Sequence, residues 1–377
     1  MNIGIVCYPT YGGSGVVATE LGIALAQKGH QVHFITSHQP VKLNFLNQNL
    51  HFHEVFVENY PLFHYQPYNL ALSSKLVESV QKYQLEVLHV HYAIPHAYAA
   101  YMAKQMLKDV GIEIPIVTTL HGTDITLVGS HPVYKPAVEF SINHSDAVTT
   151  VSRSLKEDTL RLFDIKKNVE IIYNFIDFEH QETWRPEDCL RDTLAGPEEK
   201  LLVHVSNMRP VKRVTDVIRI FYKVQQKIPS KLLLVGDGPE REKTDLLVNE
   251  LGIKHKVLFL GKSDEIRKIL CLSDLFLLPS ETESFGLAAL EAMAGKTPVI
   301  SSNTGGLPEV NVHGVTGFLS NVGDVEDMAR NAIYLLEDDE RLARFKQQAY
   351  EGAQKFSIDI ILPKYEKMYR RVIKNGY

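Results

Sequence analysis

The sequence has few of the residues that mark secreted, metal-bound or membrane-embedded proteins. Its three cysteines, Cys7, Cys189 and Cys271, are odd in number and far apart in 377 residues. They fit neither a disulfide framework nor a zinc or redox motif, so a reduced cytoplasm is expected. The amino terminus has no basic segment before its first apolar run and does not resemble a signal peptide. No apolar run is long enough to span a bilayer, so we expect no stable membrane association.

The charge balance excludes a broad nucleic-acid surface. Lysine and arginine number 40, aspartate and glutamate 45, and the net charge is −5. A domain that binds nucleic acid over a wide face is normally basic, so we expect no nucleic-acid partner. The sequence also lacks any Asp-x-Asp pair, a common way of holding a divalent metal beside a diphosphate. We therefore expect no metal and no other cofactor.

What the sequence does contain is a regular alternation of short β-rich runs and helical patterns, which is typical of parallel α/β folds. In the first half we predict strands at Ile3–Cys7, Val32–Thr36, Phe52–Val55, Val87–Val90, Ile116–Thr119, Ala147–Val151 and Val169–Ile172. In the second half we predict strands at Leu201–Val205, Leu232–Val235, Val257–Leu260, Leu275–Leu278 and Pro298–Ser301. Predicted helices include Val16–Gln27, Ala71–Tyr83, Ala97–Lys108, Val214–Gln226, Arg241–Leu251 and Leu287–Ala294.

The pattern stops and restarts once, which predicts two Rossmann-like domains, each with a doubly wound parallel sheet. We assign 1–177 to the first domain, 178–200 to a linker and 201–340 to the second domain. The amphipathic tail, 341–377, is expected to be helical and to return toward the first domain. Such folds bind ligands at the carboxyl ends of their strands, so we expect a ligand cleft between the domains.

The most informative segment follows the predicted strand Leu275–Leu278 and begins a helix near Gly286. The first N–H groups of a helix have no partner within it and carry partial positive charge, so Phe285, Gly286 and Leu287 can donate to a phosphate. The helix is otherwise apolar and should be buried. Its one charged residue, Glu291, then needs partners, and the two hydroxyls of a ribose would satisfy both carboxylate oxygens. Taken alone, Glu291 and the preceding Glu283 are as compatible with a capping acid and a structural ion pair.

The spacing of these glutamates resembles that of a known family. Glu283 and Glu291 stand in the E-x7-E arrangement of the retaining glycosyltransferases with the two-domain GT-B fold. The resemblance implies that Glu291 holds the ribose and that Glu283, with Ser284, contacts the donor sugar. It also implies that the segment Phe285–Leu287 receives the diphosphate of a nucleotide sugar.

Departure of a nucleoside diphosphate builds negative charge, which fixed cations can neutralise. The segment Ser206–Arg213 follows a predicted strand and contains two candidates, Arg209 and Lys212. The family normally has an arginine five residues before the lysine, but Asn207 stands there and the arginine lies three before. Lys212 is therefore the firmer assignment. Further along, Gly261 and Lys262 end another strand, where the family has its base-binding loop.

In the first half, Gly13 and Ser14 belong to a glycine-rich turn between a strand and a helix. The turn lacks the G-x-G-x-x-G spacing of dinucleotide sites, and the resemblance implies contact with donor phosphate or acceptor. His89 and His91 share a strand face, but nothing nearby completes a metal site, so a buried, hydrogen-bonded pair is expected. Tyr92 is the better site candidate. The family resemblance implies that His121 contacts the donor sugar, with a core histidine as the rival interpretation.

Four further positions at predicted strand ends are candidates for the acceptor site together with Ser14: Tyr92, Thr119, Arg153 and Asn174. Arg153 is the fixed cation among them, and arginine pairs with carboxylates in a forked geometry. The chemistry of these residues favours an acidic acceptor. The residues expected to take part in catalysis are His121, Glu283, Arg209 and Lys212.

Several strings, among them Leu-His-Val-His-Tyr-Ala-Ile-Pro-His (88–96) and Thr-Thr-Leu-His-Gly-Thr-Asp (118–124), narrow the resemblance. They resemble members of the family that transfer N-acetylglucosamine from UDP-N-acetylglucosamine to L-malate, with retention, in bacillithiol biosynthesis. Another acceptor, such as an inositol phosphate or a cell-wall lipid, stays open. So do a nucleotide-sugar epimerase of similar fold and a non-catalytic sensor, and the broken glycine fingerprint disfavours a dehydrogenase. The oligomeric state is also open, and a homo-oligomer is compatible with the sequence.

Overall fold

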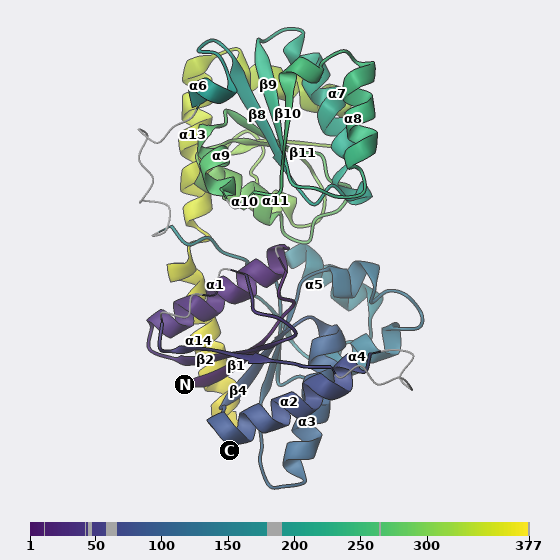
Figure 1. Ribbon diagram of the computed structural model, residues 1–377, viewed down its shortest axis with the longest axis vertical. Coiled ribbons are helices and arrows are strands. Elements are labelled where there is room, and N and C mark those ends of the chain that lie inside the picture. The colour runs from purple at the N-terminus through teal and green to yellow at the C-terminus, as the bar shows by residue number, and fades with distance from the viewer. Residues whose placement is uncertain are drawn as a thin grey trace. The chain divides into compact units, whose positions relative to one another are not determined.

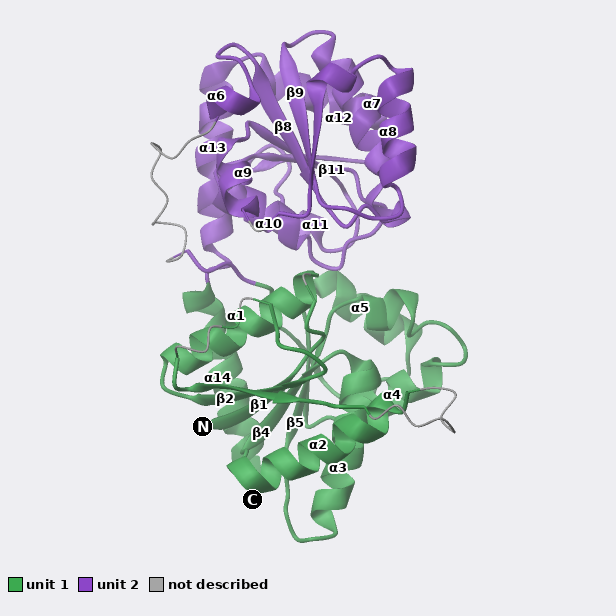
Figure 2. Ribbon diagram, viewed as in Figure 1, with its two compact units in different colours: residues 1–174, 358–377 green, residues 175–357 purple. Residues whose placement is uncertain are grey.

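The alternation of strands and helices produces two α/β units in the computed structural model of the chain. The structure describes residues 1–10, 12–41, 43, 47–57, 66–178, 191–263 and 265–375. Unit 1 comprises residues 1–174 and 358–377, and unit 2 comprises residues 175–357 (Figure 2). The chain therefore passes from unit 1 to unit 2 and returns to unit 1 for its last helix.

Unit 1 is built on a seven-stranded parallel sheet with the order β3-β2-β1-β4-β5-β6-β7. Its strands are β1 (Asn2–Val6), β2 (Gln31–Thr36), β3 (Leu50–Glu54), β4 (Val87–His91), β5 (Ile116–Leu120), β6 (Ala147–Thr150) and β7 (Val169–Ile171). The strand order reverses between β1 and β4, which are hydrogen-bonded neighbours. Ligands of doubly wound folds bind beside the carboxyl ends of the strands at such a reversal.

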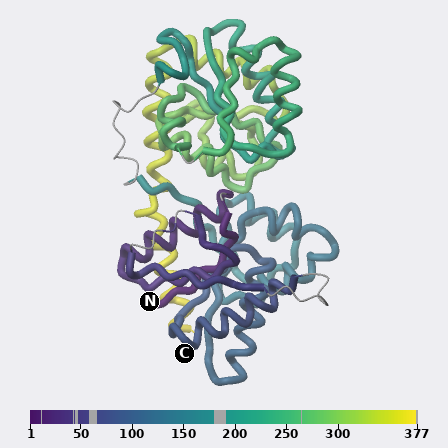
Figure 3. The backbone as a smooth tube through the Cα atoms, viewed as in Figure 1, coloured from purple at the N-terminus to yellow at the C-terminus, as the bar shows by residue number. Residues whose placement is uncertain are grey.

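Helices cover both faces of this sheet, as Figure 1 shows. They are α1 (Gly13–Gln27), α2 (Tyr68–Tyr83), α3 (Tyr98–Lys108), α4 (Lys135–His144), α5 (Arg153–Leu162) and α14 (Ile358–Asn375), with short segments η1 (Ala93–Ala97) and η2 (Thr123–Leu127). The last helix, α14, packs against α1, β4 and β5. Figure 3 shows this carboxyl-terminal helix in yellow beside the purple amino-terminal elements. Its Tyr365 and Tyr369 are among the largest fully buried side chains.

Unit 2 repeats the design with a six-stranded parallel sheet of order β10-β9-β8-β11-β12-β13. Its strands are β8 (Lys200–Val205), β9 (Ser230–Val235), β10 (Val257–Gly261), β11 (Leu275–Leu278), β12 (Val299–Ser302) and β13 (Gly317–Ser320). Its helices are α6 (Arg191–Leu194), α7 (Val214–Gln225), α8 (Arg241–Glu250), α9 (Ile266–Leu272), α10 (Leu287–Ala294), α11 (Leu307–Val310), α12 (Val325–Leu336) and α13 (Asp339–Gln354), with η4 (Pro210–Lys212) and η5 (Lys254–Lys256). Here the order reverses between β8 and β11.

The fold class expected from the sequence is confirmed, and most predicted strands lie within one or two residues of the observed ones. Strand β13 was not predicted. Of the segment 178–200, predicted as a linker, residues 179–190 with Trp184 and Cys189 lie outside the described part of the chain. The remainder includes α6, whose Arg191 pairs with Asp274 of unit 2 at 2.7 Å. Across the described residues, no helix combines the length and apolarity needed to cross a membrane.

Candidate functional site

The candidate residues of unit 2 gather where β8 and β11 end, at the reversal of the strand order. The ammonium group of Lys212 donates to Oε1 of Glu283 at 2.5 Å. The hydroxyl of Ser280 donates to the same oxygen at 2.9 Å. Lys212 and Glu283 are separated by 71 residues and both side chains are largely buried, with 21% and 13% exposed. The structure thus joins two residues that the sequence assigned separately to the diphosphate and the sugar.

The buried His204 supports the loop that carries Lys212 and Arg209. Because a carbonyl only accepts, Nδ1–H of His204 donates to the Leu277 carbonyl, at 2.8 Å, and ties β8 to β11. Its Nε2 therefore accepts from the Ser206 hydroxyl at 2.8 Å, and that oxygen receives the Met208 N–H at 3.1 Å. Burial lowers the pKa of His204 to about 4, so the ring is neutral at physiological pH. Sequence reasoning missed this residue, since a histidine inside an apolar strand gives no signal of its own.

The start of α10 has the properties expected of a phosphate site. The residue before the helix, Gly286, has φ = 95° and supplies no side-chain cap. This positive φ favours glycine, and a Cβ at Gly286 would in addition lie 2.6 Å from Cδ2 of Leu307. The first main-chain bond of the helix runs from Leu290 N–H to the Gly286 carbonyl. Within the described residues, the N–H groups of Leu287, Ala288 and Ala289 have no partner and remain available to an anion.

The observed position of Glu291 differs from the prediction that it is buried. The helix is buried on most of its surface, but Glu291 is only partly buried and shares its face with Leu287 and Ala288, which are also partly exposed. The i, i+3 and i, i+4 spacing of these residues places them on one side of the helix, above its first turn. Glu291 therefore lies on the partly exposed face of α10 and not in its buried core.

A glycine pair after β12 completes this corner of unit 2. The N–H of Gly306 donates to the Glu283 carbonyl at 2.9 Å. A Cβ on Gly305, which has φ = 56°, would lie 1.9 Å from that carbonyl oxygen. The main chain of Glu283 is thus held directly by a loop that admits only glycine. Sequence analysis did not select Gly305 or Gly306, although their position after a strand was a usable signal.

The other donor-site candidates occupy strand ends of the same unit. Asn207 and Arg209 are exposed in the loop after β8. Within the described part of the chain, the Arg209 guanidinium has no ion pair. Its neighbour Arg213 forms an ion pair with Asp216 of α7, with Nε and the carboxylate oxygen 2.7 Å apart. Gly261, with φ = 66°, ends β10, and Lys262 beyond it is exposed.

The candidates of unit 1 meet where β1 and β4 end. The hydroxyls of Ser14, in the first turn of α1, and Tyr92, just after β4, are 2.6 Å apart. Burial raises the pKa of Tyr92 to about 12, so it keeps its proton. Gly15 allows the helix to start here, because a Cβ would lie 2.5 Å from the Tyr8 carbonyl. Gly13, the residue before Ser14, is exposed, and Tyr11 lies outside the described residues.

His121 lies just after β5, beside Tyr92, with the ring centroids 5.1 Å apart. Its Nε2 is 2.8 Å from Nδ1 of His91, the last residue of β4. Asp124 accepts the N–H groups of His121 and Gly122 through one oxygen and that of Ala93 through the other. Burial lowers the pKa of His121 to about 3 and raises that of Asp124 to about 6. His121 is therefore a neutral ring held in a fixed frame.

Thr119 lies in the buried core of unit 1. Its hydroxyl is fully buried, 2.7 Å from Nε2 of His89 and 2.7 Å from the Thr149 hydroxyl. It belongs to the buried network beneath α14, so its assignment to the acceptor site needs correction. The expectation that His89 and His91 are buried, hydrogen-bonded histidines is confirmed.

Two acceptor candidates lie at the ends of β6 and β7. Arg153 is exposed as the first residue of α5, whose cap Ser152 accepts the Leu155 N–H at 3.0 Å. Asn174 is buried, with 7% of its surface exposed. Arg153 is therefore exposed to solvent, whereas Asn174 has little exposed surface.

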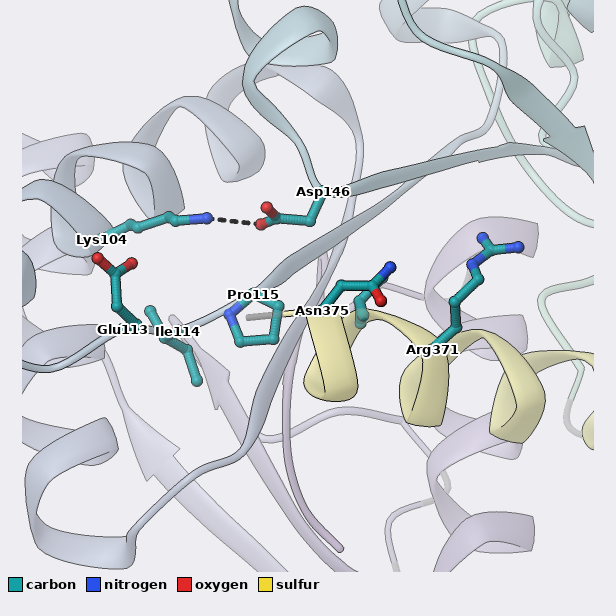
Figure 4. Close-up of a pocket in the computed structure, with 8 residues that line it drawn as sticks. Lys104, Glu113, Ile114, Pro115, Asp146, Arg371 and Asn375 are labelled. Atoms are coloured by element: carbon teal, nitrogen blue, oxygen red, sulfur yellow. Dashed lines mark hydrogen bonds and ion pairs between the residues drawn. The ribbon is translucent and has the colours of Figure 1, made fainter. Parts of the chain in front are cut away.

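One pocket, of about 130 Å³, lies at the opposite edge of the unit 1 sheet (Figure 4). Lys104 and Asp146 beside it form an ion pair of 2.7 Å, and Asp146 also accepts the Ile116 N–H. The residues that line the pocket lie near the amino ends of β5 and β6 and the end of α14. These polar groups satisfy one another and hold strands together, so we assign this pocket no part in the reaction. Among the residues described, no group of three or more His, Cys, Asp or Glu side chains is arranged to hold a metal.

Comparison with known proteins identifies the class of enzyme to which the chain belongs. Residues 189–352 match the family model "Glycosyl transferases group 1", and residues 11–180 match "Glycosyltransferase Family 4". Anabaena HepE in complex with UDP-glucose has the same fold, with a TM-score of 0.81 at 20% identity over 98% of this chain and 100% of that one. The chain is a glycosyltransferase of the GT-B fold.

Two similar proteins show which glycosyltransferase family the chain belongs to. The chain is 48% identical over 380 residues to N-acetyl-alpha-D-glucosaminyl L-malate synthase of Bacillus anthracis, covering 100% of this chain and 99% of that protein. It is 30% identical to an uncharacterized glycosyltransferase of Methanocaldococcus jannaschii, over 81% of this chain and 80% of that one. The chain belongs to the glycosyltransferase family of the Bacillus anthracis synthase.

Proposed function

We propose that the chain transfers N-acetylglucosamine from UDP-N-acetylglucosamine to the hydroxyl of L-malate, with retention at the anomeric carbon. The donor and acceptor are those implied by the name of the Bacillus anthracis relative, which matches over the full chain. The observation that carries the transferase chemistry is the contact between Lys212 and Glu283 beside the open start of α10. The proposal places the reaction in the cytoplasm, in keeping with the absence of any disulfide or metal spacing among the cysteines.

On this proposal, the diphosphate binds at the N–H groups of the first turn of α10, and Glu291 takes the ribose hydroxyls on the same accessible face. Lys212 has three N–H donors, so it can keep its bond to Glu283 while it binds a phosphate oxygen. Oε2 of Glu283 has no partner in the described chain and is available to a sugar hydroxyl. Arg209 adds a second cation at the leaving group.

The chemical step breaks the bond from the anomeric carbon to the diphosphate and forms a bond to the malate hydroxyl oxygen on the same face. The hydroxyl proton passes to a β-phosphate oxygen, so the products are the α-glycoside of malate and UDP. Lys212 and Arg209 stabilise the charge that develops on the diphosphate. Because these cations are fixed parts of the chain, we propose that no metal is needed.

The test is incubation of the protein with UDP-N-acetylglucosamine and a panel of hydroxy acids, followed by product mass and anomeric NMR. We expect an α-linked product with malate, at a rate that EDTA leaves unchanged. Transfer to another hydroxy acid but not to malate would reject the acceptor. A sugar product without any acceptor would indicate an epimerase, and loss of activity in EDTA with rescue by Mg²⁺ would reject metal independence.

A further inference from the structure

The contact between His91 and His121 indicates which ring nitrogen of His121 carries the proton. The two facing nitrogens, Nδ1 of His91 and Nε2 of His121, are 2.8 Å apart. Burial holds the pKa of His121 at about 3 and that of His91 well below its usual range, so both rings are neutral. Each ring then carries one proton, and one of the facing nitrogens must donate while the other accepts.

The second nitrogen of His91 decides between the two arrangements. Nε2 of His91 is buried and has no hydrogen-bond partner. If His121 donated, the proton of His91 would lie on that nitrogen as a buried N–H without an acceptor, an arrangement that is rare in folded proteins. If His91 donates through Nδ1–H, its Nε2 carries only a lone pair. The remaining proton of His121 then lies on Nδ1.

The main chains of His91 and His121 are both held by hydrogen bonds, so the position of this contact is built into the fold. Nδ1–H of His96 donates to the His91 carbonyl at 2.5 Å, and the ring of His91 packs against His89 with centroids 4.4 Å apart. On the other side, Asp124 holds the N–H of His121. Nδ1 of His121 has no hydrogen-bond partner among the described residues, and the side chain is partly exposed beside Tyr92.

We propose that His91 is a positioning residue that fixes His121 as the Nδ1–H tautomer, so that His121 presents a hydrogen-bond donor to the bound substrate. A donor at this place suits a ligand oxygen, such as a sugar hydroxyl or a phosphate oxygen. The opposite tautomer would present a lone pair there and would repel the same oxygen. The choice of tautomer by the second ring nitrogen is a general property of histidine sites. The consequence for turnover rests on the function proposed above, but the tautomer itself does not.

The first measurement is the tautomer of His121 in the full-length protein without substrate, from long-range ¹H–¹⁵N correlations of the histidine rings. We expect the Nδ1–H pattern in the wild type. His91→Asn places an amide N–H close to the position of Nδ1 and should keep that pattern, whereas His91→Leu removes the donor and should shift His121 toward the Nε2–H form. His89→Asn is the matched control, because it alters the neighbouring buried histidine without touching His121 and should leave the tautomer unchanged.

The second measurement is steady-state kinetics with UDP-N-acetylglucosamine and malate. Loss of a hydrogen bond to a charged ligand oxygen typically costs about 10- to 100-fold in activity. We expect that loss in kcat for His91→Leu, with a smaller change in KM and recovery to within a few fold in His91→Asn. An Nε2–H pattern in the wild type, or His91→Leu with wild-type tautomer and kinetics, would overturn the inference. Failure of the wild type to use malate rejects the proposed function alone, because the tautomer is read without substrate.

Discussion

The hydroxyl of Tyr369 lies 2.7 Å from Nδ1 of His89, across 280 residues of chain and within the core of unit 1. Nε2 of the same ring faces Thr119, and the Thr119 hydroxyl faces Thr149. Hydroxyls and a histidine ring can each donate and accept, so these four side chains form one continuous hydrogen-bonded chain. This chain of buried hydrogen bonds fastens α14 to β4 and β5, the strands that precede Tyr92 and His121.

Tyr369→Phe should therefore destabilise unit 1 although it removes only one oxygen. It leaves Nδ1 of His89 buried and unpaired, which costs about 1–3 kcal/mol. The measurement is the midpoint and slope of urea unfolding. Tyr134→Phe is the matched control, because Tyr134 is exposed, and it should change stability by less than about 0.5 kcal/mol. Equal stability of the two variants would show that the network contributes nothing.

Glu291→Gln should weaken UDP binding. The substitution keeps the size of the side chain but removes a charged acceptor for ribose hydroxyls, a loss of about 1–3 kcal/mol. Calorimetry with UDP measures it directly. Glu250→Gln, on the exposed face of α8, serves as the control. Unchanged affinity in folded Glu291→Gln would assign this glutamate a structural role.

Lys212 and Glu283 should act as one unit in donor binding, because their side chains are in contact. Lys212→Met and Glu283→Gln are each expected to weaken UDP-sugar binding, and the double variant should lose less than the sum of the two. Contacting residues commonly show coupling of about 0.5–3 kcal/mol. A double-mutant cycle of dissociation constants measures it. Strict additivity would contradict a persistent ion pair.

Arg153→Ala should raise the KM for malate far more than the KM for the sugar nucleotide. A charged hydrogen bond to a carboxylate contributes about 1.5–3 kcal/mol, which corresponds to roughly 10- to 100-fold. Steady-state kinetics with each substrate varied in turn gives both values. Arg161→Ala is the control on the same helix, where the arginine is exposed and pairs with Asp158. An equal effect on both KM values, or no effect, would remove Arg153 from the acceptor site.

Mild acid should destabilise unit 1 through stacked histidines of β2 and β3. Nδ1 of His33 lies 2.8 Å from Nε2 of His53, and burial lowers their pKa values to about 3 and about 4. The folded protein keeps both rings neutral while the unfolded chain protonates them below about pH 6.5. Their contribution to stability is therefore complete above pH 6.5 and is lost as the pH falls toward 4.

Thermal unfolding between pH 7.5 and pH 4.5 measures this effect. His33→Phe keeps a ring in the stack but cannot take up a proton, so its melting temperature should fall less over this interval than that of the wild type. His255→Phe, at an exposed position, should follow the wild type. Parallel curves for all three proteins would assign the acid sensitivity to other groups.

The sequence predicted local elements well where local signals were strong. The strand Leu275–Leu278 is an unbroken apolar run between Asp274 and Pro279, and the helix Leu287–Ala294 lies between two glycines, so both were predicted with their observed bounds. Strand β13 is four residues long and begins with glycine, which gives almost no β signal.

The site could be predicted only in part, because contacts across the fold leave no local trace. The E-x7-E spacing identified Glu283, but its bond to Lys212 depends on two strands that lie side by side only in the folded sheet. Thr119 sits at a strand end like Tyr92, yet both faces of a parallel sheet are covered, so strand position alone does not separate accessible from buried side chains. The partner that buries Thr119 comes from α14, at the far end of the chain.

The return of α14 to unit 1 also sets the order in which the two units can finish folding during synthesis on the ribosome. The first 174 residues emerge without Tyr365 and Tyr369, so the sheet of unit 1 lacks part of its core while all of unit 2 is made. Unit 2 is continuous in sequence and can close first. A fragment that stops before Ile358 would expose the apolar surface that α14 covers and aggregate, whereas a chain that joins residues 358–375 to residue 1 would carry unit 1 as one uninterrupted segment.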